Sequence, residues 1–364
     1  MKGAILVNPG EPLEIADLTL GNVRAGEVQV RVEKASVCHT DLTIQQGGFP
    51  QPVPAVIGHE AAGGVEAVGE GVRRLKPGDR VIGIANPFCG QCSYCYRGET
   101  FLCSAEATFR APDDAQRVVR NGDGVFTMAG LGAFSEQMLA HENSLVAIPG
   151  ELSFTKATLL GCGVSTGLGA ALNTAGVGAG DAVVVIGCGT VGLTAIQGAR
   201  VAGASRIFAV DLLEAKLRIA QSVGATDVID ANGPDTAATI LELTSGGADI
   251  AIECIGKPET TALAVQAVRR GGTAVLVGFM PLGANIELPG TEFLYTGKRL
   301  LASVLGSTNF LTELPRYVAL IEAGEVDLDV LLSDHFRLDE INEAMARLQA
   351  GDVVKPVIDI GEAA

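Results

Sequence analysis

The chain is poor in aromatic side chains and in positive charge. Its 364 residues include 12 phenylalanines, 4 tyrosines and no tryptophan. Lysine and arginine number 26 against 42 acidic residues, which gives a formal net charge of −16. A chain this acidic lacks the electrostatic footprint of proteins that bind nucleic acids or anionic membranes. Both classes of partner are therefore excluded, although a small basic site could still bind one phosphorylated cofactor.

Long apolar runs are also missing. None reaches the roughly 18 residues that a membrane-spanning helix needs. The first nine residues, MKGAILVNP, become polar too early for a secretory signal, so we expect a cytoplasmic protein. The eight cysteines of such a chain stay reduced, which favours metal ligands over disulfides.

Glycine is abundant, with 47 residues. Hydrophobic residues make up 48% of the chain and charged residues 19%, which excludes wholesale disorder. The glycines predict many tight turns and close backbone approaches, as in α/β proteins with bound cofactors. The length predicts about two domains, because a single core rarely grows far beyond about 250 residues.

The hydrophobic pattern changes near residue 157. Before it, alternating segments such as Val28–Val32 predict half-buried strands between loops rich in proline and glycine. After it, wholly apolar runs alternate with helical stretches, which predicts right-handed βαβ units and a doubly wound parallel sheet. These runs are Ala182–Ile186, Arg206–Val210, Ile250–Ile252 and Ala274–Val277. Towards the end of the chain we expect helices over Pro315–Ala323 and Leu338–Gln349, and a strand over Lys355–Ile360.

Gly187-x-Gly189-x-x-Gly192 lies between the first apolar run and a helical stretch. The glycines permit a tight turn, close approach of the backbone to a pyrophosphate, and close packing of the helix on the strand. Asp211 ends the next strand, where a carboxylate can accept from ribose hydroxyls and would repel a 2′-phosphate. This predicts a site for NAD rather than NADP, against the alternative of an ordinary βα turn. Lys216 could add a cation near the adenosine ribose, or could be a solvated helix lysine.

Four cysteines stand close together in the sequence. Four thiolates within 15 residues can close a tetrahedral shell around Zn²⁺, and a closed shell predicts a structural site. An iron–sulfur cluster is the alternative, because thiolates also hold those. The four are Cys89, Cys92, Cys95 and Cys103.

A second donor set is dispersed along the chain as Cys38, His59 and Cys162. Two thiolates and one imidazole are a ligand set of catalytic zinc, with the fourth position open to water or substrate. The sequence alone does not show that the three side chains meet. His59 taken by itself could equally be a buried histidine with its hydrogen bonds satisfied.

These motifs, in this order, resemble those of zinc-dependent medium-chain alcohol dehydrogenases. The resemblance covers essentially the whole chain. It implies an α/β protein in which a GroES-like β-rich catalytic domain, residues 1–163 and 305–364, holds both zinc sites. A Rossmann domain with a doubly wound parallel sheet, residues 164–304, would bind NAD. The matching motifs are Cys38-His39-Thr40-Asp41, Gly58-His59-Glu60, the four-cysteine cluster, Gly161-Cys162-Gly163 and Gly187–Gly192.

The resemblance implies a role for each matching residue near the metal. Cys38, His59 and Cys162 would hold the catalytic zinc, and Glu60 would lie behind it as a transient ligand during water exchange. Asp41 would orient His59 through the free ring N–H, although a surface acid is the alternative. With the four-cysteine site, two zinc ions per subunit are expected.

The remaining roles concern the alcohol and the cofactor. Thr40 would accept the substrate proton and pass it to the ribose. His39 and Lys355 would place cations against the pyrophosphate, and Thr166 would lie beside the nicotinamide ring. The implied reaction is NAD-dependent oxidation of a primary alcohol to an aldehyde, and the reverse, by hydride transfer from a zinc-bound alkoxide.

Two positions depart from the family's pattern. Thr43 stands where many members carry a histidine that completes the proton relay, so that step would need water, buffer or another group. Ala85 replaces an aromatic residue of the liver-type enzymes, which implies a wider pocket suited to aryl or bulky aliphatic alcohols.

Three further expectations concern alternatives and assembly. Glutathione-dependent formaldehyde dehydrogenases also resemble the chain, but the acidic pair that they carry is absent from residues 47–52. A remote alternative is a recruited non-enzymatic structural or binding protein, against which the complete donor set argues. The long segment from Cys103 to Phe134 resembles that of dimeric relatives, so we expect a homodimer with a small-molecule substrate.

Overall fold

The computed structural model describes residues 1–111, 114–233 and 235–361, which form two compact units. Unit 1 contains residues 1–162, 309–315 and 332 onward, and unit 2 contains residues 163–308 and 316–331. The division differs from the predicted one chiefly at residues 316–331, which pack with unit 2. There the side chain of Gln197 donates to the carbonyl of Asp327 and accepts from its N–H, at 3.1 and 2.6 Å.

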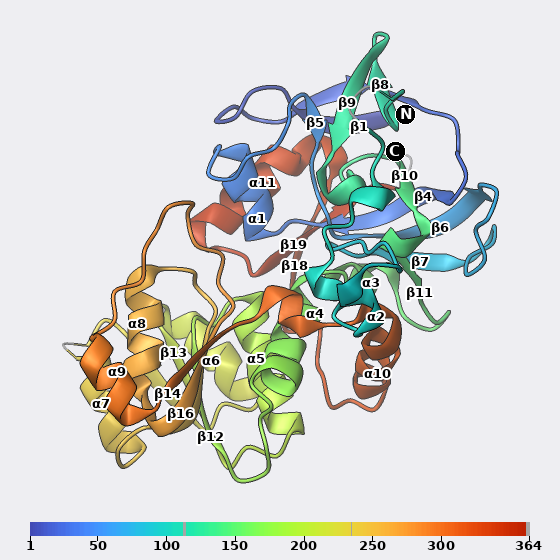
Figure 1. Cartoon of the computed structure of the whole chain (residues 1–364). Helices are drawn as coiled ribbons and strands as arrows, with labels where there is room; N and C mark the ends of the chain where they lie inside the picture. Colours follow the sequence, from blue (N-terminus) through green and yellow to red (C-terminus); the bar gives the residue numbers. More distant parts are fainter. Residues whose placement is uncertain (112–113, 234, 362–364) are drawn as a thin grey trace. The chain divides into compact units, whose positions relative to one another are not determined.

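Unit 2 is built on a six-stranded, all-parallel sheet with the order β14-β13-β12-β15-β16-β17. Chain order reverses at β12, so right-handed crossovers place α5 and α6 on one face and α7 and α8 on the other (Figure 1). The strands are β12 Ala182–Ile186, β13 Arg206–Asp211, β14 Asp227–Asp230, β15 Ala248–Glu253, β16 Val268–Leu276 and β17 Arg299–Ala302. The helices are α4 Gly163–Gly169, α5 Thr190–Val201, α6 Glu214–Ser222, α7 Thr236–Leu243, α8 Pro258–Ala267 and α9 Gly290–Thr296.

The predicted doubly wound sheet is therefore confirmed. Strand β12 is apolar along its length because helices cover both of its faces, and the side chains of Val183–Ile186 are buried. Two short irregular helices complete the unit. A π-helical turn, Ala170–Thr174, continues α4, and a 3₁₀ turn, Val304–Ser307, follows β17.

Unit 1 is the β-rich part of the molecule. One sheet has the order β11-β7-β6-β4-β19-β18, with β10 also paired to β4, and a second has the order β2-β1-β5-β9-β8-β3. The first sheet contains β4 Glu27–Ser36, β6 Ala61–Val68, β7 Arg80–Gly83, β10 Gln137–His141, β11 Leu145–Ala147, β18 Leu332–Arg337 and β19 Lys355–Asp359. The second contains β1 Lys2–Leu6, β2 Glu14–Asp17, β3 Thr19–Leu20, β5 Ala55–Val56, β8 Val118–Arg120 and β9 Asp123–Thr127.

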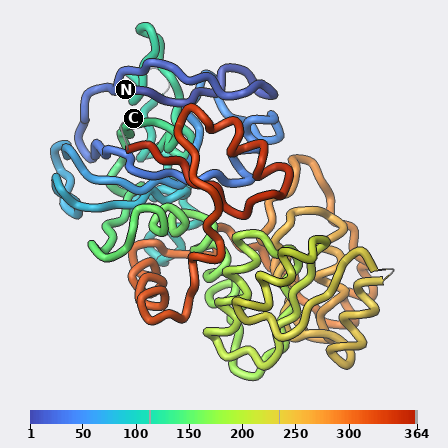
Figure 2. Tube along the Cα trace, turned by 180° about the vertical axis from the view of Figure 1, so that it is seen from behind, coloured from blue at the N-terminus to red at the C-terminus, as the bar shows by residue number. Residues whose placement is uncertain are grey.

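The C-terminal strand completes the larger sheet. β19 pairs antiparallel with β4, which brings residues 357–359 beside residues 34–36, and Figure 2 shows the red end of the chain entering the blue N-terminal part. The helices of unit 1 are α1 His39–Gln45, α2 Ser93–Tyr96, α3 Phe154–Leu160 and α11 Ile341–Ala350, and α10 Phe310–Glu322 begins there and ends in unit 2. No helix in the described chain is long and apolar enough to cross a membrane.

Candidate active site

The dispersed donor set comes together within unit 1. One ligand atom from each of Cys38, His59, Glu60 and Cys162 lies within 4.8 Å of the others. Cys38 is the N-cap of α1, His59 and Glu60 directly precede β6, and Cys162 follows α3. His59 and Glu60 are 2% and 0% exposed, so four polar donors converge on one buried point. Thiols, an imidazole and a carboxylate grouped in this way are donors that Zn²⁺ prefers.

Asp41 joins the helix that carries Cys38 to the imidazole of His59. Its Oδ2 accepts from the Cys38 backbone N–H at 2.8 Å, and its Oδ1 lies 3.0 Å from His59 Nδ1. Asp41 itself is 0% exposed, which excludes the alternative of a surface acid. The contact occupies Nδ1 and leaves Nε2 as the imidazole nitrogen available to a metal.

Glu60 forms a hydrogen bond and an ion pair with side chains outside the donor set. Its Oε2 accepts from the hydroxyl of Ser36 and forms an ion pair with Lys355 Nζ, whereas Oε1 is buried and has no partner among the described residues. Lys355 is 2% exposed. The resemblance implies that the Lys355 ammonium lies against a pyrophosphate. In the structure this ammonium forms an ion pair with the Glu60 carboxylate within unit 1, a contact that the prediction did not include.

Buried charges determine the protonation of these groups. A hydrogen bond from the Cys162 thiol, aided by Lys355, holds the pKa of Cys38 well below its usual range, and the same bond raises the pKa of Cys162. Burial opposes the charge on His59, but the Asp41 carboxylate outweighs it and raises the pKa of His59. Positive charge thus gathers around a thiolate, the form of cysteine that binds metals.

Thr40 lies beside the Cys38 thiol at the start of α1. The Cys38 Sγ lies 3.7 Å from Thr40 Oγ1, and the side chain of Thr40 is half-buried on α1. His39, one residue earlier, is exposed. Thr43 uses its hydroxyl within α1, donating to the carbonyl of His39 at 3.0 Å. Thr40 thus offers a hydroxyl next to the Cys38 thiol, whereas the Ser36 hydroxyl is bonded to Glu60.

The four-cysteine cluster has the spacing of a tetrahedral metal site. Its Sγ atoms lie 3.6 Å apart for Cys92 and Cys95, 3.7 Å for Cys92 and Cys103, and 3.9 Å for Cys89 and Cys95. Zn–S bonds of about 2.3 Å in a tetrahedron separate the sulfurs by about 3.8 Å. An iron–sulfur cluster distributes its thiolates over several irons and would separate them more widely. One ion within four sulfurs is therefore the better fit.

Backbone amides also point at these sulfurs. The N–H groups of Cys89 and Ala105 donate to Cys103 Sγ, each at 3.3 Å, and that of Gln91 donates to Cys89 Sγ at 3.5 Å. Such donors stabilise negative charge on sulfur. Two other cysteines stand apart from both donor sets. Cys188 is buried in the glycine turn, residues 187–192, and Cys254 follows β15.

The glycine turn of unit 2 has the geometry that a pyrophosphate requires. Gly187 has φ +92°, and a Cβ on Gly192 would lie 1.8 Å from the carbonyl oxygen of Gly187, so a larger residue would separate α5 from β12. Nothing lies within 4 Å of a Cβ placed on Gly189, which is the N-cap of α5. The open side of the turn and the amino end of α5 thus face the same space.

Asp211 is fixed at the rim of this turn. Its Oδ2 accepts from the N–H of Cys188 at 2.7 Å, and its Oδ1 accepts from the N–H of Leu213 at 3.0 Å. Lys216 is half-buried on α6, the helix that follows β13. Asp211 ends β13, and the glycine turn follows the neighbouring strand, β12.

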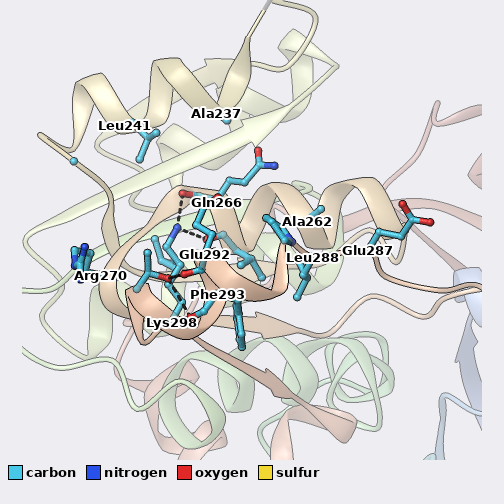
Figure 3. A pocket seen from close by; sticks show the side chains of 15 residues that line it. Ala237, Leu241, Ala262, Gln266, Arg270, Glu287, Leu288, Glu292, Phe293 and Lys298 are labelled. Carbon is cyan, nitrogen blue, oxygen red and sulfur yellow. Dashed lines mark hydrogen bonds between the residues drawn. The ribbon is translucent and has the colours of Figure 1, made fainter.

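A separate cavity lies elsewhere in unit 2. It has a volume of about 360 Å³ between α7, α8 and α9 (Figure 3). Lys298 reaches the carbonyls of Val265 and Gln266 in its wall, at 2.8 and 3.3 Å. Its lining includes the first residue of β16 and the residue before β17, so it opens at the amino ends of the strands. Ligands of open α/β sheets bind at the carboxyl ends, where the glycine turn lies.

Two family models match the chain. The alcohol dehydrogenase GroES-like domain matches residues 24–150, and the zinc-binding dehydrogenase model matches residues 190–323. A curated S-(hydroxymethyl)glutathione dehydrogenase from Photobacterium damsela subsp. piscicida is 38% identical over 366 residues, covering 98% of this chain and 99% of that protein. The chain belongs to the zinc-dependent medium-chain alcohol dehydrogenases. It is accordingly an oxidoreductase, and its α/β fold combines a GroES-like part with a Rossmann part.

Solved structures of the family agree with this assignment. Benzyl alcohol dehydrogenase from Acinetobacter calcoaceticus superimposes with a TM-score of 0.92 at 33% identity, covering 99% of both chains. A zinc-binding dehydrogenase from Sinorhizobium meliloti 1021, bound to NADP, has a TM-score of 0.83 at 27% identity, covering 98% of both chains. The names of the relatives thus differ in the substrate that they give, and one of the neighbours is bound to NADP.

Sequence reasoning missed two contacts of the site. Ser36, on β4, donates to Glu60, and Lys355, on β19, forms its ion pair with Glu60. Ser36 carries no local motif that could have been recognised. The sequence indicates Lys355 only through the resemblance, because its pairing partner lies 295 positions away.

Proposed function

We propose that this alcohol dehydrogenase uses NAD and two zinc ions to oxidise primary alcohols, aryl or bulky aliphatic, to aldehydes, and catalyses the reverse reaction. The convergence of Cys38, His59, Cys162 and Glu60 on one buried point carries the proposal. Metal analysis tests it directly. Two zinc ions per chain are expected, and one ion with no dehydrogenase activity would refute it.

The residues of unit 1 prepare an alcohol for hydride loss. Zinc in the buried donor set would supply Lewis acidity that lowers the alcohol's pKa, and NAD would supply the hydride acceptor. Thr40 Oγ1, next to Cys38, would accept the alcohol proton while its own hydroxyl proton passes on to the cofactor ribose. Asp41 holds His59 in one ring orientation, and Lys355 balances the charge of Glu60.

NAD rather than NADP is proposed because of Asp211. Its carboxylate is held at the rim of the glycine turn by two backbone N–H groups, so it cannot easily turn away from a ribose. A fixed carboxylate accepts from ribose hydroxyls and repels a 2′-phosphate. A lower Michaelis constant for NAD than for NADP supports this, and equal constants would contradict it.

The preference for larger alcohols rests on Ala85. Its backbone N–H donates to the carbonyl of Gly161 at 3.1 Å, which places the backbone of Ala85 next to the segment that carries Cys162. A residue this small leaves room beside the donor set. Replacing Ala85 by Phe should lower kcat/KM for benzyl alcohol at least tenfold relative to ethanol. An unchanged ratio would exclude Ala85 as a determinant of pocket width.

A second candidate is the oxidation of S-hydroxymethylglutathione, because the curated relatives at 38% identity carry that name. Residues 47–52, GGFPQP, lack the acidic pair that the glutathione-dependent enzymes carry, which disfavours it. Formaldehyde oxidation with and without glutathione, beside benzyl alcohol oxidation, separates the two. Activity that appears only when both formaldehyde and glutathione are present would establish the second candidate.

We also propose a homodimer. In the described chain β17 pairs with β16 alone, so one edge of the parallel sheet keeps free backbone donors and acceptors. Leu294 and Tyr295 on neighbouring α9 are 76% and 74% exposed. An open edge beside exposed apolar side chains favours pairing with a second copy. Sedimentation of the wild-type chain as a monomer at micromolar concentration would refute this.

A further inference from the structure

Residues 305–307 turn in the left-handed backbone region. Leu305, Gly306 and Ser307 have φ values of +47°, +70° and +49°. Six non-glycine residues of the described chain have positive φ, and Leu305 has the largest side chain among them. A bulky residue rarely adopts this conformation, and it persists only where the surroundings hold it. The contacts that hold residues 305–307 in this conformation therefore indicate the function of the turn.

Two glycines let the turn press against helix α4. A Cβ on Gly306 would lie 2.5 Å from the carbonyl oxygen of Ser165 and 2.7 Å from that of Thr166. A Cβ on Gly169 would lie 2.3 Å from the carbonyl oxygen of Gly306. The backbone of the turn thus lies directly on the backbone of α4, without side chains between them.

Side-chain hydrogen bonds fasten both ends of the turn. Thr174 Oγ1 lies 2.7 Å from Ser303 Oγ and 2.8 Å from Ser307 Oγ. Asn173 Nδ2 donates to the carbonyl of Gly306 and to the hydroxyl of Tyr317, at 3.3 and 3.2 Å. Asn173 and Thr174 lie on the π-helical turn that continues α4, a form of helix found often at functional sites.

One neighbouring group points to a ligand. Thr166 is 7% exposed, and its buried Oγ1 has no hydrogen-bond partner among the described residues. A buried hydroxyl without a partner is costly unless a ligand supplies one. This hydroxyl lies on the same stretch of α4 that the turn covers.

The order of the strands indicates which half of a bound dinucleotide would lie near Thr166 and the turn 305–307. Asp211 follows β13 and the glycine turn follows β12, whereas β15, β16 and β17 lie on the other side of β12. A dinucleotide with its adenosine ribose at Asp211 therefore extends its nicotinamide half towards β15–β17. The left-handed turn follows β17, and the N–H of Ser303 donates to Leu276 at the end of β16.

We propose that Thr174, aided by Asn173, is a positioning residue that holds the strained turn 305–307 in place beside Thr166 to receive the nicotinamide half of the cofactor. The proposal rests on the proposed use of NAD. Without the Thr174 hydroxyl, Leu305 would relax towards negative φ and the turn would leave its place on α4. The adenosine half would bind as before, because Asp211 and the glycine turn are separate from this network.

The experiment compares binding of NADH with binding of ADP-ribose, which lacks the nicotinamide, by titration calorimetry on the zinc-loaded enzyme. Thr174→Val should weaken NADH binding about tenfold, from two lost hydrogen bonds, and change ADP-ribose binding less than about twofold. Thr174→Ser keeps the hydroxyl and should bind both as the wild type does. Equal weakening of both ligands by Thr174→Val, or no weakening of either, would overturn the proposal.

A second variant tests the strain itself. Glycine adopts positive φ without penalty, so adding Leu305→Gly to Thr174→Val should restore most of the NADH affinity. Leu305→Ala removes the same side chain but keeps the Cβ, and it should not restore affinity. Ser245→Gly is the matched control, because Ser245 has φ +55° in a loop of the same unit. Rescue by the alanine or by the control, or no rescue by glycine, would show that strain plays no part.

Loss of cofactor binding and loss of the role of Thr174 give different results. If the wild-type enzyme binds neither NADH nor ADP-ribose, the proposed function is wrong. If it binds both and oxidises alcohols with NAD, while Thr174→Val binds NADH normally, only the role of Thr174 is wrong.

Discussion

Replacing Glu27 by Gln tests how the long segment from Cys103 to Phe134 is held. Glu27 lies on β4, and its Oε1 accepts from Arg110 Nε at 2.9 Å and from Arg117 Nε at 3.0 Å. All three side chains are about 5% exposed. The glutamine would leave two buried guanidinium groups without their common carboxylate.

The pKa of Glu27 gives the size of the effect. Burial raises it, but hydrogen bonds from Arg110, the Arg24 backbone and Arg117 outweigh burial and lower it from 4.5 to about 2. A shift of this size corresponds to about 3 kcal/mol of stability. Breaking a buried ion pair costs a similar amount, about 3–5 kcal/mol. We therefore expect Glu27→Gln to lower the free energy of unfolding by about 3 kcal/mol at pH 7.

The pH dependence has a definite sign. Because the folded pKa lies below the unfolded value, the contribution is complete above pH 4.5 and is lost as the pH falls towards about 2. Urea unfolding followed by circular dichroism should show the gap between wild type and variant narrowing by about 2 kcal/mol between pH 7 and pH 3.

A matched control separates burial from pairing. Glu14 forms an ion pair with Arg120 at the surface, where the two side chains are 50% and 31% exposed. Glu14→Gln should lower the free energy of unfolding by less than about 1 kcal/mol. Both variants lose metal at low pH, so the comparison removes that effect. Equal effects of the two substitutions, or a gap for Glu27→Gln that does not narrow with falling pH, would refute the reasoning.

Three further outcomes are expected. Cys162→Ser should abolish alcohol oxidation and reduce the zinc content by one ion per chain while ADP-ribose still binds; retained turnover would remove Cys162 from the donor set. Cys103→Ser should also remove one zinc, but it should lower the melting temperature by several degrees as well, and normal stability would contradict a structural site. Asp211→Ala should weaken NAD binding about tenfold and improve the use of NADP, whereas an unchanged cofactor preference would exclude its ribose role.

Several strands were predictable because their signal is local. Ala182–Ile186 matches β12, and Arg206–Val210 falls one residue short of β13. The predicted helix over 315–323 begins five residues late, because Pro315 lies inside α10 and not at its start. The helix over 338–349 corresponds to a 3₁₀ turn, Leu338–Glu340, followed by α11.

The site shows the same division between local and distant information. The four-cysteine cluster closes within one short segment, so its spacing alone indicated a metal shell. The approach of Cys38 to Cys162, by contrast, depends on α3 packing against β4 and β6, which brings Cys162, just after α3, near Cys38, just after β4. The buried group formed by Glu27 and two arginines of a later segment left no pattern to recognise.

The sequence by itself determined the features that depend on residues close together in the chain. The turn at Gly187–Gly192, the acid after the next strand and the four close cysteines each report their chemistry within about 25 residues. Only the tertiary structure decided the partner of Lys355, the place of residues 316–331 and the strain in the turn at Leu305. These depend on burial and on contacts between residues more than 100 positions apart, where folding, and not spacing, chooses the neighbour.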